Sequence, residues 1–413
     1  MKQNLFRRAG LALALLLALC APHSAALAEA DDSYFEAVPG VVLPLEEEID
    51  SSFEPAPENW PEDDYDTQGA GALSDVPDAD EAFELLDDAY APVAGSEYTL
   101  DDALADAVPT FPRTFTITVG GDTTLGSTDA LRKRDDCFEN VVAEKGYDWP
   151  FSGLVELFSQ DDMTLVNFEG TLTESNDAKE KKFNFKAPAD YTQILLSGSI
   201  EAVNIANNHI VDYNAGGKQD TIDALEAAGL VVSGGGILGI YESGGVKVGM
   251  TGYCFPYTNG KKDISKDVQA LREAGCQIVV ASFHWGSEYS YDFTAEQRSI
   301  GRAAIKAGAD VVIGHHPHVV QGIEKYNDTY ILYSLGNLVF GGNVDPDDRT
   351  AYVARLTFTV TEDSCSAPDL EIIPIRLTEL SDGTDYRPVL AQGEEAEQIK
   401  SKILRKSYKM EDY

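Results

Sequence analysis

The stretch of sequence that decides the fold is Asp310-Val311-Val312-Ile313-Gly314-His315-His316-Pro317-His318. Its β-branched run, 311–313, is typical of a buried strand, and three imidazoles follow where that strand ends. Pro317 restricts the backbone between His316 and His318, and ordinary packing does not explain so many histidines together. The stretch therefore predicts a strand that delivers metal-binding side chains to its carboxyl end.

Four further apolar runs end in the same way, with polar side chains that can bind a metal. They are Thr116–Val119 before Gly121-Asp122, Thr164–Phe168 before Glu169, Ala202–Ala206 before Asn207-Asn208-His209, and Gln277–Phe283 before His284-Trp285-Gly286-Ser287-Glu288. Open α/β sheets bind ligands just beyond the carboxyl ends of their strands. The five runs together therefore predict an α/β fold with a metal-dependent site at that edge.

The cluster around His209 is a stronger signal than a carboxylate alone. A turn explains Gly121-Asp122 as well as a metal site does. Helix capping explains Asn207 and Asn208 but leaves His209 unexplained. Asp212 lies three residues further on and is placed to orient that imidazole. We therefore expect His209 to be a site residue that Asp212 orients.

Four residues at the rim are candidates for contact with substrate. They are Asn207, Glu288, His315 and Asn337. Asn337 closes the segment Ser334-Leu335-Gly336-Asn337, which a β-turn explains equally well. A site role for this group therefore depends on the stronger clusters beside it.

The N-terminus has the pattern of an export signal. Lys2, Arg7 and Arg8 precede an apolar core, Leu11–Leu19, and a small-residue stop, Ala26-Leu27-Ala28. The core is shorter than the roughly 20 apolar residues that span a membrane. We expect residues 1–28 to be a signal peptide cleaved after Ala28, with an uncleaved membrane anchor as the alternative. The protein would then be exported, to the cell surface or the extracellular space.

The acidity of the chain is concentrated near its start. Residues 31–110 contain 24 Asp plus Glu and no Lys or Arg, within a chain of formal net charge −39. Such a segment repels itself and buries too little apolar surface to fold, so we expect residues 29–112 to be a disordered acidic spacer rich in Pro and Ala. Acidic faces disfavour nucleic acid as a partner. An anionic substrate would need a local source of positive charge, and a bound metal ion would supply it.

About 300 residues follow the spacer, which is enough for one large α/β domain. Helical patterns alternate with the apolar runs at 151–159, 191–197, 217–228, 268–274 and 294–307. From residue 246, strands at 246–253, 322–325, 329–333, 352–360 and 370–377 have fewer helices between them, which indicates a mixed sheet. We expect two packed sheets with helices outside, over residues 113–380. Residues 381–413 would form a C-terminal extension with a terminal helix over 394–408.

Four cysteines follow the predicted signal peptide, Cys137, Cys254, Cys276 and Cys365. Their spacing matches no zinc motif. We interpret them as buried free thiols, although an exported protein permits a disulfide.

Taken in order, these motifs resemble those of the CapA family, which comprises capsule or poly-γ-glutamate synthesis proteins related to the calcineurin-like metallophosphatases. The resemblance covers residues 115–377. It implies a four-layer α/β/β/α sandwich of two mixed sheets. It also implies two kinds of partner, an anionic polymer such as poly-γ-glutamate or capsular material, and membrane-bound polymer synthesis machinery.

The resemblance also assigns roles to residues, motif by motif. The implied ligands of one or two divalent ions (Mn, Fe or Zn) are Asp122, Glu169, Asn208, His284, His316 and His318. His209 resembles the imidazole that protonates the leaving group. Thr124 stands where these phosphatases usually have a His, and Glu169 where they usually have a bridging Asp. One metal position is therefore short of a ligand.

The motifs and the resemblance together suggest two functions of different classes. The first is metal-assisted hydrolysis of a phosphoester or an amide-like bond. The second is a non-enzymatic surface factor that binds or exports an anionic polymer through a degenerate metal site, which the residue at position 124 favours. A (β/α)₈ amidohydrolase barrel is disfavoured because the His-x-His pair follows a late strand and not the first one.

Overall fold

The computed structural model describes residues 110–256 and 261–410. The predicted signal peptide, its cleavage site and nearly all of the acidic spacer lie outside this part of the chain. Among the described residues, no helix has both the length and the hydropathy that crossing a membrane requires.

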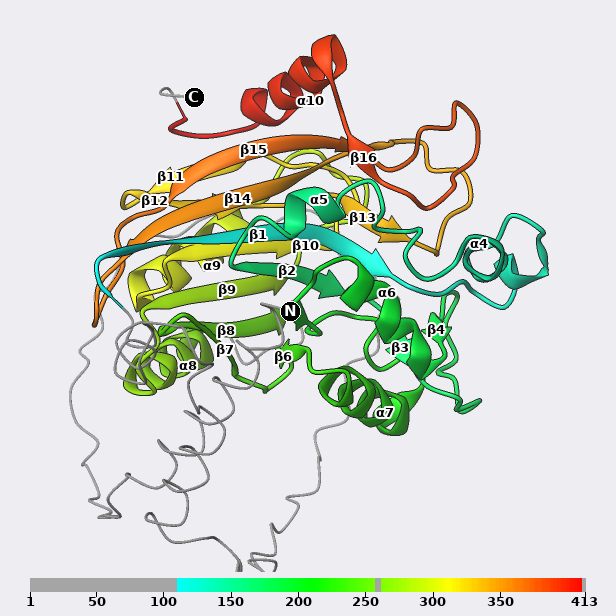
Figure 1. The fold of residues 1–413 in the computed structure, drawn as a ribbon, viewed down its shortest axis with the longest axis horizontal. Helices are drawn as coiled ribbons and strands as arrows, with labels where there is room; N and C mark the ends of the chain where they lie inside the picture. Colours follow the sequence, from blue (N-terminus) through cyan, green and yellow to red (C-terminus); the bar gives the residue numbers. More distant parts are fainter. Residues whose placement is uncertain (1–109, 257–260, 411–413) are drawn as a thin grey trace, which may run out of the picture. The chain divides into compact units, whose positions relative to one another are not determined.

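The larger sheet has eight strands in the described residues, in the order β16-β15-β14-β1-β2-β5-β6, with β13 paired to β1 (Figure 1). Their bounds are β1 Arg113–Thr124, β2 Met163–Phe168, β5 Ala202–Asn204, β6 Val231–Ser233, β13 Asn337–Phe340, β14 Thr350–Val360, β15 Asp369–Arg376 and β16 Val389–Leu390. Strands β1, β2, β5 and β6 are parallel, whereas β14 runs antiparallel to β1. The sheet is therefore mixed, as predicted.

The smaller sheet has six strands in the order β11-β12-β10-β9-β8-β7. Their bounds are β7 Gly239–Ser243, β8 Val246–Cys254, β9 Ile278–His284, β10 Val311–His315, β11 Ile323–Tyr326 and β12 Thr329–Leu332. The central strands β8, β9, β10 and β12 are parallel, and β7 and β11 add antiparallel edges. A short separate pair, β3 Thr171–Leu172 and β4 Lys186–Ala187, completes the strands of the described residues.

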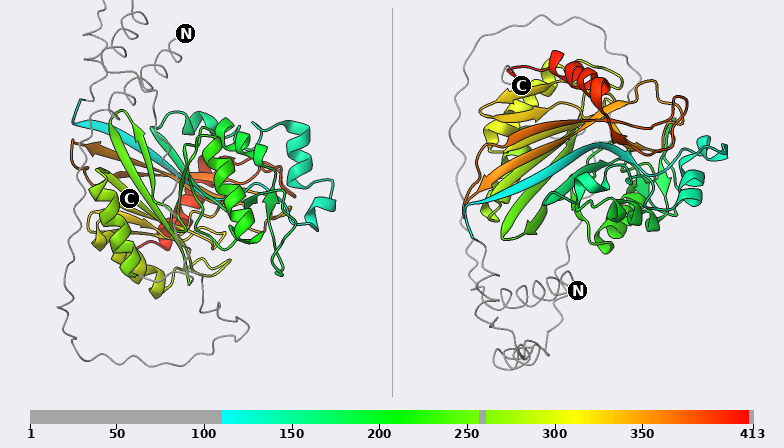
Figure 2. Two further views of the ribbon diagram at one scale, coloured as in Figure 1. Left: turned by 90° about the horizontal axis from the view of Figure 1, so that it is seen from below. Right: turned by 45° about the horizontal axis from the view of Figure 1, so that its top comes forward.

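Alternate side chains of β9 belong to two different cores. Ile278 and Val280 pack with residues of the larger sheet, whereas Val279, Ala281 and Phe283 pack with α8 and α9. A strand that is apolar on both faces must be covered on both, which explains the continuous apolar run at 278–283. The layers are therefore helix, sheet, sheet and helix, and the predicted α/β/β/α sandwich is confirmed. Figure 2 shows the two layers of strands from two further directions.

The helices lie outside the two sheets, with α8 and α9 beside the smaller sheet and α10 along β15 (Figure 1). Their bounds are α4 Phe138–Lys145, α5 Val155–Phe158, α6 Thr192–Ser197, α7 Asn214–Ala227, α8 Lys261–Glu273, α9 Ala295–Ala307 and α10 Gly393–Arg405, with 3₁₀ turns η1 Leu131–Lys133 and η2 Ala189–Tyr191. Thr294 caps α9, since its side chain accepts from the Gln297 N–H while the Gln297 side chain accepts from the Thr294 N–H.

The structure differs from the sequence-based expectation at a few elements. The helical pattern at 151–159 yields only one turn of α-helix, α5, and α8 begins seven residues before the predicted start at 268. Helix α4 and the short strands β6, β7 and β13 were not predicted. The predicted C-terminal helix is present as α10, and the segment after residue 380 also adds β16 to the larger sheet. The four cysteines of the described residues are free thiols, as interpreted, but only Cys137 and Cys276 are buried, whereas Cys254 and Cys365 are partly exposed.

Candidate metal centre

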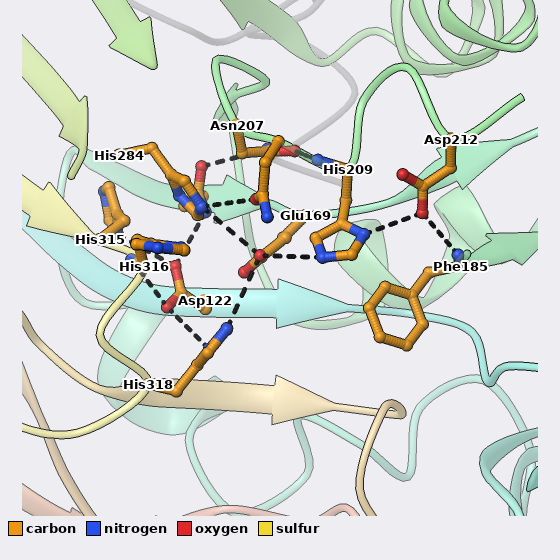
Figure 3. A network of polar contacts seen from close by, with 12 residues as sticks. Asp122, Glu169, Phe185, Asn207, His209, Asp212, His284, His315, His316 and His318 are labelled. Atoms are coloured by element: carbon orange, nitrogen blue, oxygen red, sulfur yellow. Dashed lines mark hydrogen bonds and ion pairs between the residues drawn. The ribbon is translucent and has the colours of Figure 1, made fainter. Parts of the chain in front are cut away.

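Strand register brings the candidate side chains to one level at the carboxyl ends of both sheets. In the larger sheet, Asp122 pairs with Asn167, and Asn167 pairs with Asn204. In the smaller sheet, His315 pairs with His284. The loops that follow these strands meet between the sheets, where their side chains point toward one another (Figure 3).

Glu169 lies at the centre of this cluster (Figure 3). Its Oε1 is 3.5 Å from His284 Nε2, 3.8 Å from His318 Nε2 and 3.9 Å from His209 Nε2. The side chain is fully buried, and neither carboxylate oxygen has a hydrogen-bond partner. Burial raises the pKa of Glu169 well above its ordinary value. A buried carboxylate without a partner is costly, and a bound cation would remove that cost.

Two sets of ligand atoms share Glu169. One contains Glu169, His284 and His316, and the other contains Asp122, Glu169 and His318, with the ligand atoms of each set within 4.8 Å of one another. Asn208 Oδ1 joins the first set, since it lies 2.8 Å from His284 Nε2. Ligands of one ion lie about 3 Å apart when each is about 2.1 Å from it. The donor set therefore fits two neighbouring ions bridged by Glu169.

The imidazoles of the first set are in the protonation state that binds metal. Burial lowers the pKa of His284 well below its ordinary value, and burial also lowers the pKa of His316. Neutral imidazole offers a free lone pair. His316 Nδ1 is a buried atom without a hydrogen-bond partner, so this nitrogen is available to bind a metal ion.

Asp122 is held in place by groups from two segments, strand β2 and the 316–318 loop. Its Oδ1 accepts from Asn167 Nδ2 at 2.8 Å, and its Oδ2 accepts from the His316 N–H at 3.2 Å. His318 Nδ1 lies 3.3 Å from Oδ2. Burial alone would raise the pKa of Asp122, but the hydrogen bond and the charge of His318 hold that pKa below its ordinary value. Asp122 is therefore ionised and pre-positioned for a cation.

The backbone of the 316–318 loop has an uncommon conformation. His316 has φ 95° and His318 has φ 57°, in the left-handed region that residues with a Cβ seldom adopt. His318 is fixed by Asn337, whose Oδ1 lies 2.8 Å from Nδ1. Burial alone would lower the pKa of His318, but the carboxylates of Glu169 and Asp122 raise it to about 10. Strain of this kind persists where surrounding contacts enforce it, and functional sites are the usual place.

His209 faces the cluster through Nε2 and a second carboxylate through Nδ1. The Nδ1 atom is 2.8 Å from Asp212 Oδ2, which also accepts from the Phe185 N–H at 2.7 Å. Burial lowers the pKa of His209, against the opposing effect of Asp212. Lys181 makes an ion pair with Asp212, and its Nζ lies 3.3 Å from His209 Nδ1. The structure therefore places a Lys–Asp–His array beside the ligands.

The four predicted substrate contacts differ in their surroundings. Asn207 uses its amide within the protein, donating to the Phe168 carbonyl at 2.7 Å and accepting from the His209 N–H at 3.1 Å. His315 is buried, with Nδ1 3.6 Å from Asp122 Oδ1. Asn337 supports His318, whereas Glu288 is exposed. A substrate contact by any of the four stays a prediction, and Asn207 and Asn337 hold other site residues in place.

Two residues that contact the site were not singled out from the sequence. Asn167 is fully buried, donates to Asp122 and accepts from Asn204 Nδ2 at 2.8 Å. Its signal was a polar residue inside an otherwise apolar strand. Lys181 comes from the loop between β3 and β4, and no local pattern marks it as a site residue.

Thr124 offers no imidazole at the position where the resemblance implies one. Its side chain is fully buried on β1, and its hydroxyl has no hydrogen-bond partner. The set of Asp122, Glu169 and His318 therefore has three protein ligands.

Two mixed sheets with helices outside, and a buried cluster of carboxylate and imidazole side chains at their carboxyl edge, define an α/β/β/α sandwich protein with a candidate metal centre. The chain belongs to the family of bacterial capsule synthesis proteins PGA_cap, whose family model matches residues 116–342. The resemblance inferred from the motifs is thereby confirmed.

Relatives carry names consistent with that family. The chain is 32% identical over 227 residues to the PGA biosynthesis protein CapA of Bacillus subtilis, covering 49% of this chain and 59% of the relative. It is 27% identical over 270 residues to the capsule biosynthesis protein CapA of Bacillus anthracis, covering 58% of this chain and 64% of the relative. The match thus spans less than two thirds of either relative. Among solved structures, the calcineurin-like phosphoesterase YfkN from Bacillus subtilis aligns with 66% of this chain and 94% of its own, at 14% identity and a TM-score of 0.42.

Proposed function

We propose that this protein is an exported, metal-dependent hydrolase of capsule or poly-γ-glutamate biosynthesis, which cleaves a phosphoester or an amide-like bond. One observation carries the proposal. Glu169 is fully buried, both of its oxygens lack partners, and it lies among imidazoles contributed by three loops. This arrangement is unfavourable without a cation and favourable with one.

The residues that would hold the ions are those brought together by the two sheets, namely Asp122, Glu169, Asn208, His284, His316 and His318. Their mixture of nitrogen and oxygen donors suits Mn, Fe or Zn. A divalent ion bound there would supply Lewis acidity, which generates a nucleophile from water at neutral pH and polarises a phosphoryl or carbonyl oxygen.

His209 would handle the proton of the leaving group. Asp212 accepts from its Nδ1, which leaves Nε2 directed toward Glu169 and the reacting centre. A proton held on Nε2 can pass to a leaving oxygen or nitrogen, and Asp212 stabilises the imidazolium before transfer. Lys181, paired with Asp212, keeps that carboxylate in position.

The surroundings of His209 support an anionic substrate. Lys179, Lys181 and Lys182 lie on the exposed loop between β3 and β4, and Lys181 reaches His209. Cations next to the site, in a chain of net charge −39, give a local attraction for carboxylates or phosphates. Membrane-bound polymer synthesis machinery is the partner that the family membership suggests.

The test compares wild-type protein with His209→Ala. Metal content is measured by mass spectrometry, and hydrolysis is followed with bis(p-nitrophenyl) phosphate and with poly-γ-glutamate. The variant should keep its metal and lose about 10²–10⁴-fold in kcat. Full activity of the variant would remove His209 from this role. A wild-type protein that binds no divalent metal and cleaves neither substrate would refute the proposal.

A second candidate is a non-enzymatic factor that binds or exports the polymer. The three-ligand position next to Thr124 favours it, because a weakly held ion suits binding better than turnover. This candidate requires that wild-type protein retain poly-γ-glutamate without cleaving it, and that Glu169→Gln reduce retention. Retention that no substitution in the cluster alters would count against it.

A further inference from the structure

We propose that Glu288 is a metal ligand, which caps both ion positions from the solvent side and supplies the ligand that Thr124 does not. This inference rests on the proposed metal centre and deepens it, because it completes a coordination set with a residue that the family resemblance assigns no metal role.

Glu288 lies within reach of both ion positions. A carboxylate oxygen of Glu288 and ring nitrogens of His316 and His318 lie within 4.8 Å of one another. His316 belongs to the ligand set that contains His284, and His318 belongs to the set that contains Asp122. A carboxylate near one imidazole of each set is placed to bind an ion at either position.

The loop that carries Glu288 is hydrogen-bonded directly to the histidine loop. The Tyr289 N–H donates to the Pro317 carbonyl at 2.8 Å, and the Trp285 N–H donates to the His315 carbonyl at 3.1 Å. Tyr289 has φ 61°, in the same left-handed region as His316. Two facing loops thus adopt uncommon backbone conformations, and the hydrogen bonds between them hold Glu288 next to the two imidazoles.

Two buried glutamine side chains also hold the loop that carries Glu288 in place. Gln321 Nε2 donates to the Ser290 carbonyl at 2.8 Å, and Gln297 Nε2 donates to Gln321 Oε1 at 2.9 Å. Both glutamines are buried. Ligands bind well when other contacts fix their position, and this support gives Glu288 a fixed position although its side chain faces solvent.

Charge favours a metal over a substrate as the partner of Glu288. The substrate proposed above is anionic, so a bare carboxylate at the mouth of the site would repel it. With Asp122 and Glu169, Glu288 makes three carboxylates around one small volume, which suits divalent cations. Thr124 cannot replace it as an anionic ligand, because its side chain is a neutral hydroxyl.

The test measures Mn²⁺ binding by the full chain, without reference to activity. Metal-free wild type, Glu288→Gln and Glu288→Asp are titrated with Mn²⁺, and free and coupled Mn²⁺ are followed by EPR with equilibrium dialysis. Glu296→Gln is the matched control, since Glu296 is also exposed and lies at the start of the nearby helix α9.

Wild type and the control should bind two Mn²⁺ with a spin-coupled spectrum. Glu288→Gln should bind one ion as before and the second at least about tenfold more weakly, with loss of the coupled signal. Glu288→Asp should recover part of that affinity. Equal melting temperatures of the metal-free proteins would exclude misfolding as the cause.

Two results would overturn the assignment and are distinguishable. If wild type and Glu288→Gln bind two ions with equal affinity, Glu288 is not a ligand, while the proposed metal centre stands. If wild type binds no Mn²⁺, the metal centre itself is wrong, and the role of Glu288 fails with it.

Discussion

Replacing Glu169 with Gln should stabilise the metal-free protein and abolish its stabilisation by metal. Glu169 is fully buried and neither oxygen has a partner. Gln has nearly the same shape and no charge, and its amide would lie within reach of His284 Nε2, which is 3.5 Å from the carboxylate oxygen. His318 would keep Asp122 as its countercharge, 3.3 Å away.

The two effects have opposite signs and similar sizes. Replacing a buried carboxylate whose oxygens have no hydrogen-bond partner should raise the free energy of unfolding of the metal-free protein by about 1–3 kcal/mol. Metal at 1,000 times its Kd stabilises the wild type by about 4 kcal/mol. Since 1 kcal/mol shifts the Tm of a domain of this size by about 2 °C, metal should raise the wild-type Tm by about 8 °C and that of the variant by little.

The assay is thermal and urea unfolding with EDTA and with Mn²⁺. The variant should melt above the wild type in EDTA and below it in Mn²⁺. Glu139→Gln is the control, because its carboxylate accepts from the Ser127 N–H and Arg132 Nε, each at 2.9 Å. This control should lose about 1 kcal/mol in both conditions and keep the full metal increment. The reasoning is refuted if Glu169→Gln melts below the wild type in EDTA, or responds to Mn²⁺ as the wild type does.

Three further predictions concern other parts of the structure. Asp212→Asn should keep its metal and lower kcat by about 10²–10⁴-fold, because the carboxylate 2.8 Å from His209 Nδ1 orients that imidazole. A kcat within about threefold of the wild-type value would contradict this prediction. Gly121→Ala should lower the free energy of unfolding, measured with urea, by about 3 kcal/mol, since a Cβ there would lie 2.0 Å from the Gly336 carbonyl oxygen. An unchanged free energy of unfolding would show that β1 and β13 can separate. Burial raises the pKa of Glu201 from 4.5 to about 7, so the folded state binds its proton more tightly than the unfolded state, and stability should fall as pH rises from 4.5 to 7. Glu201→Gln should remove about 1–2 kcal/mol of that fall, allowing for partial exposure of the side chain, and identical pH profiles would disprove it.

Most of the sheet was predictable because strand signals are local. The run at 277–283 is mostly apolar and became β9, Ile278–His284, within one residue of the prediction. Strands β6 and β7 are short, with three and five residues, and each pairs with a neighbouring strand, β6 with β5 and β7 with β8. Helix α4 is eight residues long and marginal by itself. Such elements depend on tertiary contacts that no local pattern records.

The sequence predicted which residues lie in the candidate site better than it predicted how they are arranged. Each ligand follows an apolar run, so its residue type and its position at a strand end are visible in the sequence. The partnership of Lys181 with Asp212 was not visible, because their segments meet only after β3 and β4 pair. The support that Asn167 gives Asp122 likewise depends on the pairing of β1 with β2.

The sequence alone determined the chemistry of this protein, because side-chain type and the two-residue period of a strand are properties of short segments. Tertiary structure alone decided which candidate ligands lie within reach of one another and which backbone conformations they adopt. The His316 N–H reaches Asp122 across 194 residues of chain, and the left-handed φ of His316 accompanies that contact. This hydrogen bond joins a strand of the larger sheet to the loop that follows β10 of the smaller sheet. It forms only when the two sheets pack face to face, so no stretch of the chain could specify it by itself.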